Sequence, residues 1–236
     1  MKIFALAAVL GMATLGALPA QQNPAQAAPA SVRATAEATV SATPDRARIH
    51  IGVVTQAPNA QAAAAENAKQ LDAVLAALRK VLGPQAAVRT IGYSVNPNMR
   101  YPREGGAPVI TGYTAQNTVE VTTDDLKLVP RVIDTATQFG ANSVQSLQFM
   151  LRDERPVRAR ALRQAAEMAR ADAEAMAAAV GLRVVGVLTM EEGERPPVRP
   201  LMRENAMLAS APDRPTPVEP GSLEVRAVVT LTMAAQ

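Results

Sequence analysis

The feature that most restricts the fold of this 236-residue chain is a period-two alternation of apolar and polar residues. Ser31–Thr43 alternates small apolar residues with Arg, Thr and Glu, and Arg46–Thr55 alternates aliphatic residues with Arg and His. Leu223–Met233 repeats the pattern near the other end of the chain. A period of two is typical of strands with one buried face. Pro44-Asp45 indicates a turn, so we expect the first two stretches to form a hairpin.

Three segments favour helices, over residues 59–82, 125–139 and 156–180. The first begins at Asn59, which suits an N-cap, and ends at Gly83-Pro84, a common helix stop. The second contains Pro130, which fits a helix only in its first turn. The third and longest begins at Pro156 and ends before Gly181.

Four further strands are expected between these segments, at Val88–Asn96, Val109–Thr122, Ser143–Leu151 and Val184–Met190. The resulting order, β-β-α-β-β-α-β-α-β-β, mixes hairpins with helices. It predicts an α+β fold in which mainly antiparallel sheets carry three helices on one face. Residues 191–221 contain seven prolines after Gly193, so we expect a Pro-rich flexible loop there.

Composition removes several classes of function. The chain has no cysteine and one histidine, His50, which excludes disulfides, thiolate metal sites, a catalytic cysteine and multi-histidine metal sites. The net charge of +3 comes from 24 Lys and Arg against 21 Asp and Glu, and no basic run exceeds two residues. We therefore expect no cofactor, no metal and no nucleic-acid partner.

The first residues are typical of an export signal. Met1-Lys2 precedes the uncharged stretch Ile3–Leu18, and Ala25-Gln26-Ala27 fits the small-x-small pattern of a cleavage site. The alternative is an uncleaved anchor, but the apolar stretch is shorter than the roughly 20 residues that span a bilayer. We expect a signal peptide over 1–27, a mature chain over 28–236 without a transmembrane span, and a periplasmic or secreted location.

Two groups of residues are candidate contacts. The first is a strip of small side chains that recurs every four residues along the longest helix: Ala161, Ala165, Ala169, Ala173 and Ala177. Such a strip permits close packing, either onto the sheet of the same chain or against another subunit. The second is a set of apolar residues in the Pro-rich loop: Leu201, Met202, Met207 and Leu208. They belong either to a partner-docking segment or to a disordered loop.

His50 and the three tyrosines also allow two interpretations each. His50 lies on the outward face of its predicted strand, where a surface role is expected and a general base of a hydrolase is the alternative. Tyr93, Tyr101 and Tyr113 all lie around the central predicted hairpin. We interpret them as core or hairpin packing, with a binding or subunit surface as the alternative.

Several short phrases, taken in order, resemble the SIMPL domain family over Val32–Met233. They are Thr43–Ile49, Ala62–Leu78, Thr90–Val95 with Tyr101, Gly112–Asn117, Gly140–Asn142 and Ala161–Gly181. The resemblance implies a bacterial periplasmic or secreted protein, with a SIMPL-like domain over 28–236 made of two intertwined β/α subdomains. The family has no established catalytic residues, so none is carried over.

Some members of this family are thought to form ring- or channel-like oligomers. The resemblance therefore implies a non-catalytic periplasmic homo-oligomer involved in envelope maintenance or stress tolerance. The first alternative is a monomeric module that binds a small ligand or another envelope protein. The second is a hydrolase that depends on His50.

Overall fold

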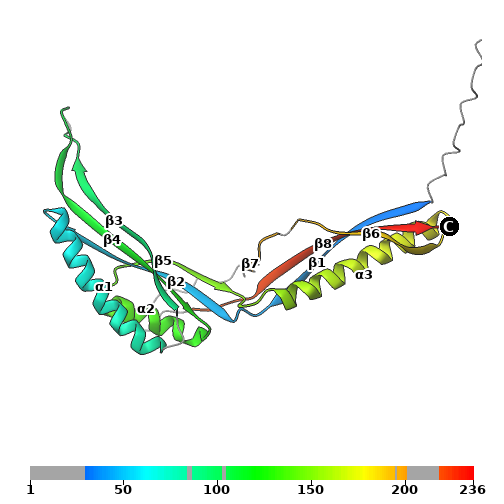
Figure 1. The fold of residues 1–236 in the computed structure, drawn as a ribbon, viewed down its shortest axis with the longest axis horizontal. Helices are drawn as coiled ribbons and strands as arrows, with labels where there is room; N and C mark the ends of the chain where they lie inside the picture. The colour runs from blue at the N-terminus through cyan, green and yellow to red at the C-terminus, as the bar shows by residue number, and fades with distance from the viewer. Residues whose placement is uncertain (1–29, 84–86, 103–104, 195, 201–217) are drawn as a thin grey trace, which may run out of the picture.

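The computed structural model describes residues 30–83, 87–102, 105–194, 196–200 and 218–236, which form two elongated lobes (Figure 1). The terminal lobe comprises β1 (Ser31–Ala42), α3 (Arg155–Ala179), β6 (Val184–Glu192), β7 (Arg199–Pro200) and β8 (Leu223–Ala235). The inserted lobe comprises β2 (Arg46–Ala57), α1 (Ala60–Leu82), β3 (Ala87–Arg100), β4 (Val109–Thr123), the 3-10 turn η1 (Leu126–Leu128), α2 (Val129–Gln138) and β5 (Ser143–Met150). The inserted lobe thus lies in the sequence between β1 and α3.

In the terminal lobe, the sheet has the order β1-β8-β6, and β7 also pairs with β8. β1 and β8 are antiparallel along their full length, from Ser31 opposite Ala234 to Ala42 opposite Leu223. α3 covers one face of these two strands. The core between them is built from Ala34, Ala36, Ala38, Ala165, Ala169, Ala173, Val229, Leu231 and Met233. Because most of these side chains are small, the helix packs closely against the sheet.

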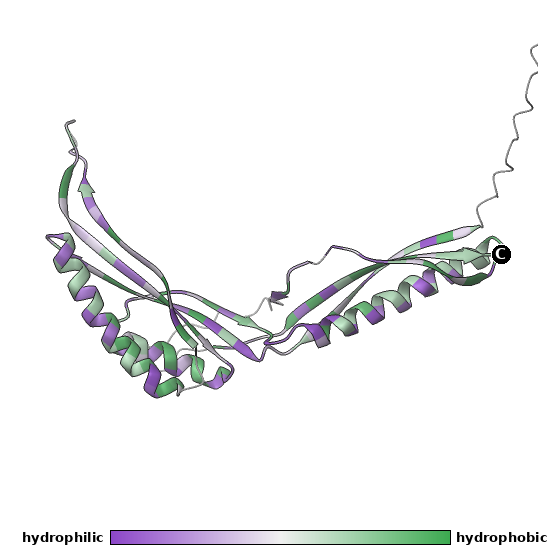
Figure 2. Cartoon of the chain, in the orientation of Figure 1, coloured by the Kyte–Doolittle hydropathy of each residue, from purple (hydrophilic) through white to green (hydrophobic). Residues whose placement is uncertain are grey.

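In the inserted lobe, the sheet has the order β3-β4-β2-β5, and α1 and α2 cover one face. Its core contains Ala47, Ile49, Ile51, Val53, Leu71, Val74, Leu78, Val119, Val121, Val129 and Val132. The inward residues of β2 are the aliphatic members of the alternation in Arg46–Thr55, as the period of two predicts. In Figure 2, hydrophilic and hydrophobic residues alternate along both long helices, as expected for helices with one buried face.

Local signals place the ends of the helices. Asn59 Oδ1 accepts a hydrogen bond from Ala62 N at 2.8 Å, which confirms the predicted N-cap of α1. Gly83 ends α1 with φ of 69°, a conformation that favours glycine. Pro130 lies in the first turn of α2, where its missing N–H is tolerated. Asp125 caps η1 by accepting from Lys127 N, so the helix expected from Asp125 is divided into η1 and α2.

The predicted hairpin between the first two strands is wrong. β1 pairs with β8 in one sheet, whereas β2 pairs with β4 and β5 in the other. The chain does not turn back at Pro44-Asp45 because Asp45 is held by the end of β5. Its N–H donates to Met150 O at 3.2 Å, and its Oδ1 accepts from Arg152 N at 2.6 Å.

The α+β class and the mainly antiparallel sheets are confirmed. The predicted loop 191–221 contains some strand, because β6 continues to Glu192 and β7 covers Arg199–Pro200. The signal peptide 1–27 and the segment 201–217 lie outside the described residues. Among the helices of the described ranges, none combines the length and the apolarity needed to cross a membrane.

Candidate functional site

The alanine strip lies inside the terminal lobe. Ala161, Ala165, Ala169, Ala173 and Ala177 are each 0% exposed. Three of them pack against β1 and β8 within the same chain, which is the first of the two alternatives that the sequence left open. A subunit contact through these alanines would require α3 to leave its sheet.

The apolar loop residues Leu201, Met202, Met207 and Leu208 lie outside the described residues. The described parts of the same loop line a cleft of about 770 Å³ between the lobes. Its walls include Pro196 and Pro197 from the loop, Phe149 from β5 and Leu223 from β8. The described parts of the loop thus border a cavity, and ligand capture beneath the loop stays a prediction.

β6 is an apolar strand at the edge of the terminal sheet. Within the described residues it pairs only with β8. Its large apolar side chains are exposed: Val185 53%, Val187 57%, Leu188 52% and Met190 67%. Val187 and Met190 stand opposite Met233 and Leu231, which are buried under α3. They stay uncovered because α3 lies over β1 and β8 and barely reaches β6.

The β3–β4 hairpin is a second apolar surface. Tyr93 is 58% exposed and Tyr101 is 73% exposed, so neither is a core residue, and of the predicted core or hairpin packing only the hairpin part fits. Tyr113 is half-buried. Met99 and Ile110 are cross-strand neighbours near the tip, and each is 48% exposed. The hairpin is uncovered there because it extends beyond α1 (Figure 1).

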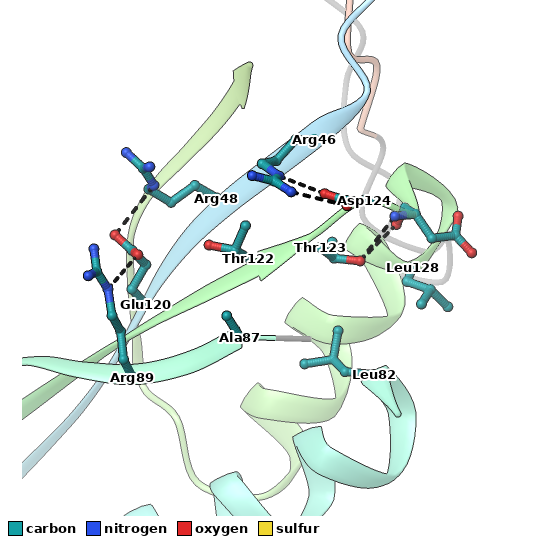
Figure 3. A pocket seen from close by; sticks show the side chains of 11 residues that line it. Arg46, Arg48, Leu82, Ala87, Arg89, Glu120, Thr122, Thr123, Asp124 and Leu128 are labelled. Atoms are coloured by element: carbon teal, nitrogen blue, oxygen red, sulfur yellow. Dashed lines mark hydrogen bonds and ion pairs between the residues drawn. The ribbon is translucent and has the colours of Figure 1, made fainter. Parts of the chain in front are cut away.

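A cluster of charged side chains lies on the inserted sheet, beside a cleft of about 700 Å³ (Figure 3). The Glu120 side chain on β4 is only 9% exposed, and it forms ion pairs with two arginines from neighbouring strands. Arg89 Nε donates to Glu120 Oε1 at 2.8 Å, and Arg48 Nε lies 3.4 Å from Glu120 Oε2. Next to them, Arg46 donates to both carboxylate oxygens of Asp124, at 2.6 and 3.1 Å.

These contacts shift the acidity of both carboxyl groups. The hydrogen bond from Arg89 lowers the pKa of Glu120 below its ordinary value, and His50 and Arg48 lower it further, while burial opposes them. The hydrogen bond from Arg46 lowers the pKa of Asp124 in the same way. Both groups are therefore held as carboxylates by their guanidinium partners.

His50 belongs to the same cluster. Its Nε2 lies 3.3 Å from Glu120 Oε2, and its register partner on β5 is Ser146. Ser146 Oγ is buried and has no hydrogen-bond partner in the described residues. The histidine thus has a carboxylate beside it, and among the described residues no hydroxyl group donates a hydrogen bond to its ring. The arrangement is that of an ion-pair network on an open sheet.

Comparison with known proteins decides the family. The SIMPL family model, described as "Protein of unknown function (DUF541)", matches residues 32–233. The chain belongs to the SIMPL family. Its similar proteins include the 26 kDa periplasmic immunogenic protein of Brucella melitensis and that of Brucella abortus. Each is 30% identical over 208 residues, which cover 86% of this chain and 83% of the relative.

The sequence of this SIMPL chain pointed to some of these surfaces and not to others. His50 was placed correctly on an outward strand face, but Glu120 and Arg89 were missed. Both lie on outward faces of strands, and only the pairing of β2, β3 and β4 brings them beside Arg48 and His50. Within the described ranges no three His, Asp or Glu side chains gather as metal ligands.

Proposed function

We propose that this chain is an exported, non-catalytic SIMPL-family protein that works in the periplasm as a homo-oligomer, in envelope maintenance or stress tolerance. The leader-like N-terminus and the periplasmic names of the relatives support the location. The observation that carries self-association is the edge strand β6, whose outer side pairs with no other described strand and whose apolar side chains are exposed.

Edge strands of this kind favour pairing with another strand. Soluble proteins usually protect a sheet edge with charges, prolines or bulges. β6 has two register irregularities, but Val185–Met190 carries no charged residue and no proline. Pairing with a second β6 would satisfy the backbone and bury Val187 and Met190 at once. The other edge of the sheet, β1, presents Arg33 and Glu37 among its exposed residues and is less suited to such a contact.

Light scattering coupled to size exclusion tests the proposal on the chain that starts at Ala28. We expect a discrete mass of at least twice that of the monomer, because each pair of β6 strands joins two chains. The double variant Val187→Lys and Met190→Lys should give the monomer mass, because two charges would have to be buried at the edge. Ile91→Lys is the matched control, since Ile91 is an exposed residue of the inserted lobe. A wild-type monomer at high micromolar concentration would contradict the proposal.

The envelope role needs a separate test in the bacterium. Deletion of the gene should lower survival under detergent challenge, and the wild-type gene should restore it. The double lysine variant should restore survival less well if the oligomer is the working form. Equal survival of the deletion and wild-type strains would contradict the envelope role while leaving self-association intact.

The cleft between the lobes favours a second candidate function, a monomeric binding module. The cleft is lined by Pro196, Pro197 and Pro220 together with apolar residues of β5 and β8. Two deletions separate the lining from the rest of the loop: residues 201–217 alone, and Pro196–Pro220. Partner capture that survives the first deletion and is lost in the second would assign it to the cleft. Partner capture that survives both deletions would show that the loop is not part of the binding site.

The hydrolase alternative is tested by His50→Ala. A non-catalytic protein should give no turnover of ester or glycoside probes with either the wild-type or the variant chain. Turnover that is present in the wild type and lost in the variant would overturn the non-catalytic part of the proposal.

A further inference from the structure

The charged cleft of the inserted lobe has a binding chemistry that the proposed self-association does not use. We propose that the cleft binds a small organic oxyanion, whose carboxylate or phosphate group is held by Arg48 and Arg89 and whose apolar part lies toward Leu82 and Leu128. This inference does not depend on the oligomeric state, because β6 lies in the other lobe.

Two guanidinium groups in the cleft are oriented by the same carboxylate. Arg48 comes from β2 and Arg89 from β3, and both turn their Nε toward the buried carboxylate of Glu120 between them (Figure 3). Their terminal nitrogens have no hydrogen-bond partner in the described part of the chain. Glu120 therefore acts as a positioning residue that fixes two arginines while leaving their outer donors open. Such donors suit bidentate recognition of an oxyanion.

The cluster around Glu120 has a net positive charge. One carboxylate, Glu120, faces two arginines, so this part of the cluster keeps a positive charge, and His50 adds to it when protonated. The adjacent pair of Arg46 and Asp124 is neutral by itself. Arg48 Nε itself is buried and faces Glu120, so a ligand would meet the outer nitrogens of this guanidinium group. An anion on the open side of the two guanidinium groups would accept hydrogen bonds from these outer nitrogens and balance the excess positive charge.

The cleft is large enough for a small molecule and has one polar side and one apolar side. Its volume of about 700 Å³ is in the range of small-molecule sites and is much larger than a single phosphate needs. Figure 3 shows the arginine cluster at one side and Leu82 and Leu128 at the other. The Thr122 side chain lies between these two sides and also lines the cleft. A ligand with one anionic end and one apolar end fits this division of polar and apolar walls.

The test is a nuclear magnetic resonance titration of the mature chain with benzoate, with the neutral benzamide as its matched probe. We expect saturable shifts for benzoate at the Nε–H of Arg48 and Arg89 and at the amides of β4 near Glu120. Benzamide should give none. Inorganic phosphate should bind at the same arginines but more weakly than benzoate, because it leaves the apolar wall unused.

Variants on the same strand separate site binding from general charge. Arg89→Gln should weaken benzoate binding about tenfold, the expected effect of losing one charge-assisted hydrogen bond. Arg100→Gln makes the same charge change at the far end of β3 and should leave binding unchanged. Arg89 is 68% exposed at its side chain, so its replacement should not unfold the lobe. Equal binding of benzoate and benzamide, equal effects of the two substitutions, or no saturation would overturn the inference.

Discussion

At the scale of single residues, Asn67 ties the main helix of the inserted lobe to two strands. It is 0% exposed, and its Nδ2 donates to Val53 O at 2.8 Å and to Ala115 O at 3.1 Å. Replacing it with alanine would leave two buried carbonyl groups without this donor. We expect Asn67→Ala to lower the free energy of unfolding by about 2–4 kcal/mol in urea denaturation. Gln61→Ala, at an exposed position of α1, should change it by less than about 0.5 kcal/mol.

The lowered pKa of Glu120 leads to a prediction about how the free energy of unfolding depends on pH. Its pKa in the folded chain lies below its ordinary value of 4.5, so it stabilises the fold fully above pH 4.5. That contribution is lost as the pH falls through the lowered pKa of the folded state. Urea unfolding between pH 6 and pH 3 should show a steeper loss of stability for the wild type than for Glu120→Gln. Parallel curves would show that the carboxylate contributes nothing to this dependence.

At the scale of elements, the packing of α3 on its sheet depends on small side chains. Ala169 is fully buried among β1 and β8, whereas Ala171 is exposed on the same helix. Ala169→Leu should destabilise the chain by about 1–3 kcal/mol because the helix must move away from the sheet. Ala171→Leu should stay within about 0.5 kcal/mol in the same denaturation experiment. Similar losses for both variants would mean that helix propensity, and not packing, sets the effect.

The elements also show what could be predicted from sequence. Strand and helix positions were predicted within a few residues because their signals are local, such as the cap Asn59 three residues from its partner. The pairing of β1 was predicted wrongly, because its partner is β8, nearly the whole chain away, and not the neighbouring β2. A period of two says which face is buried but not which strand lies beside it. The cluster around Glu120 could not be foreseen for the same reason.

At the scale of the whole molecule, the inserted lobe begins and ends at one point. Asp45 N lies 3.2 Å from Met150 O, so the two ends of the segment meet. The segment carries its own sheet, two helices and nearly all of its core, with Val218 as a contact from outside. We expect residues 45–151, expressed alone, to unfold cooperatively in urea. A non-cooperative transition would show that the two lobes depend on each other to fold.

The central claim is that β6 pairs with a second β6, and disulfide trapping tests it most directly. The chain has no cysteine, so single cysteines can be placed in turn from Val185 to Met190. Paired strands bring Cα atoms within the separation that a disulfide needs. The account predicts crosslinked dimers that peak at one position of β6 and are absent for Thr39→Cys on β1, the opposite edge. Crosslinking at Thr39 with none along β6 would contradict it.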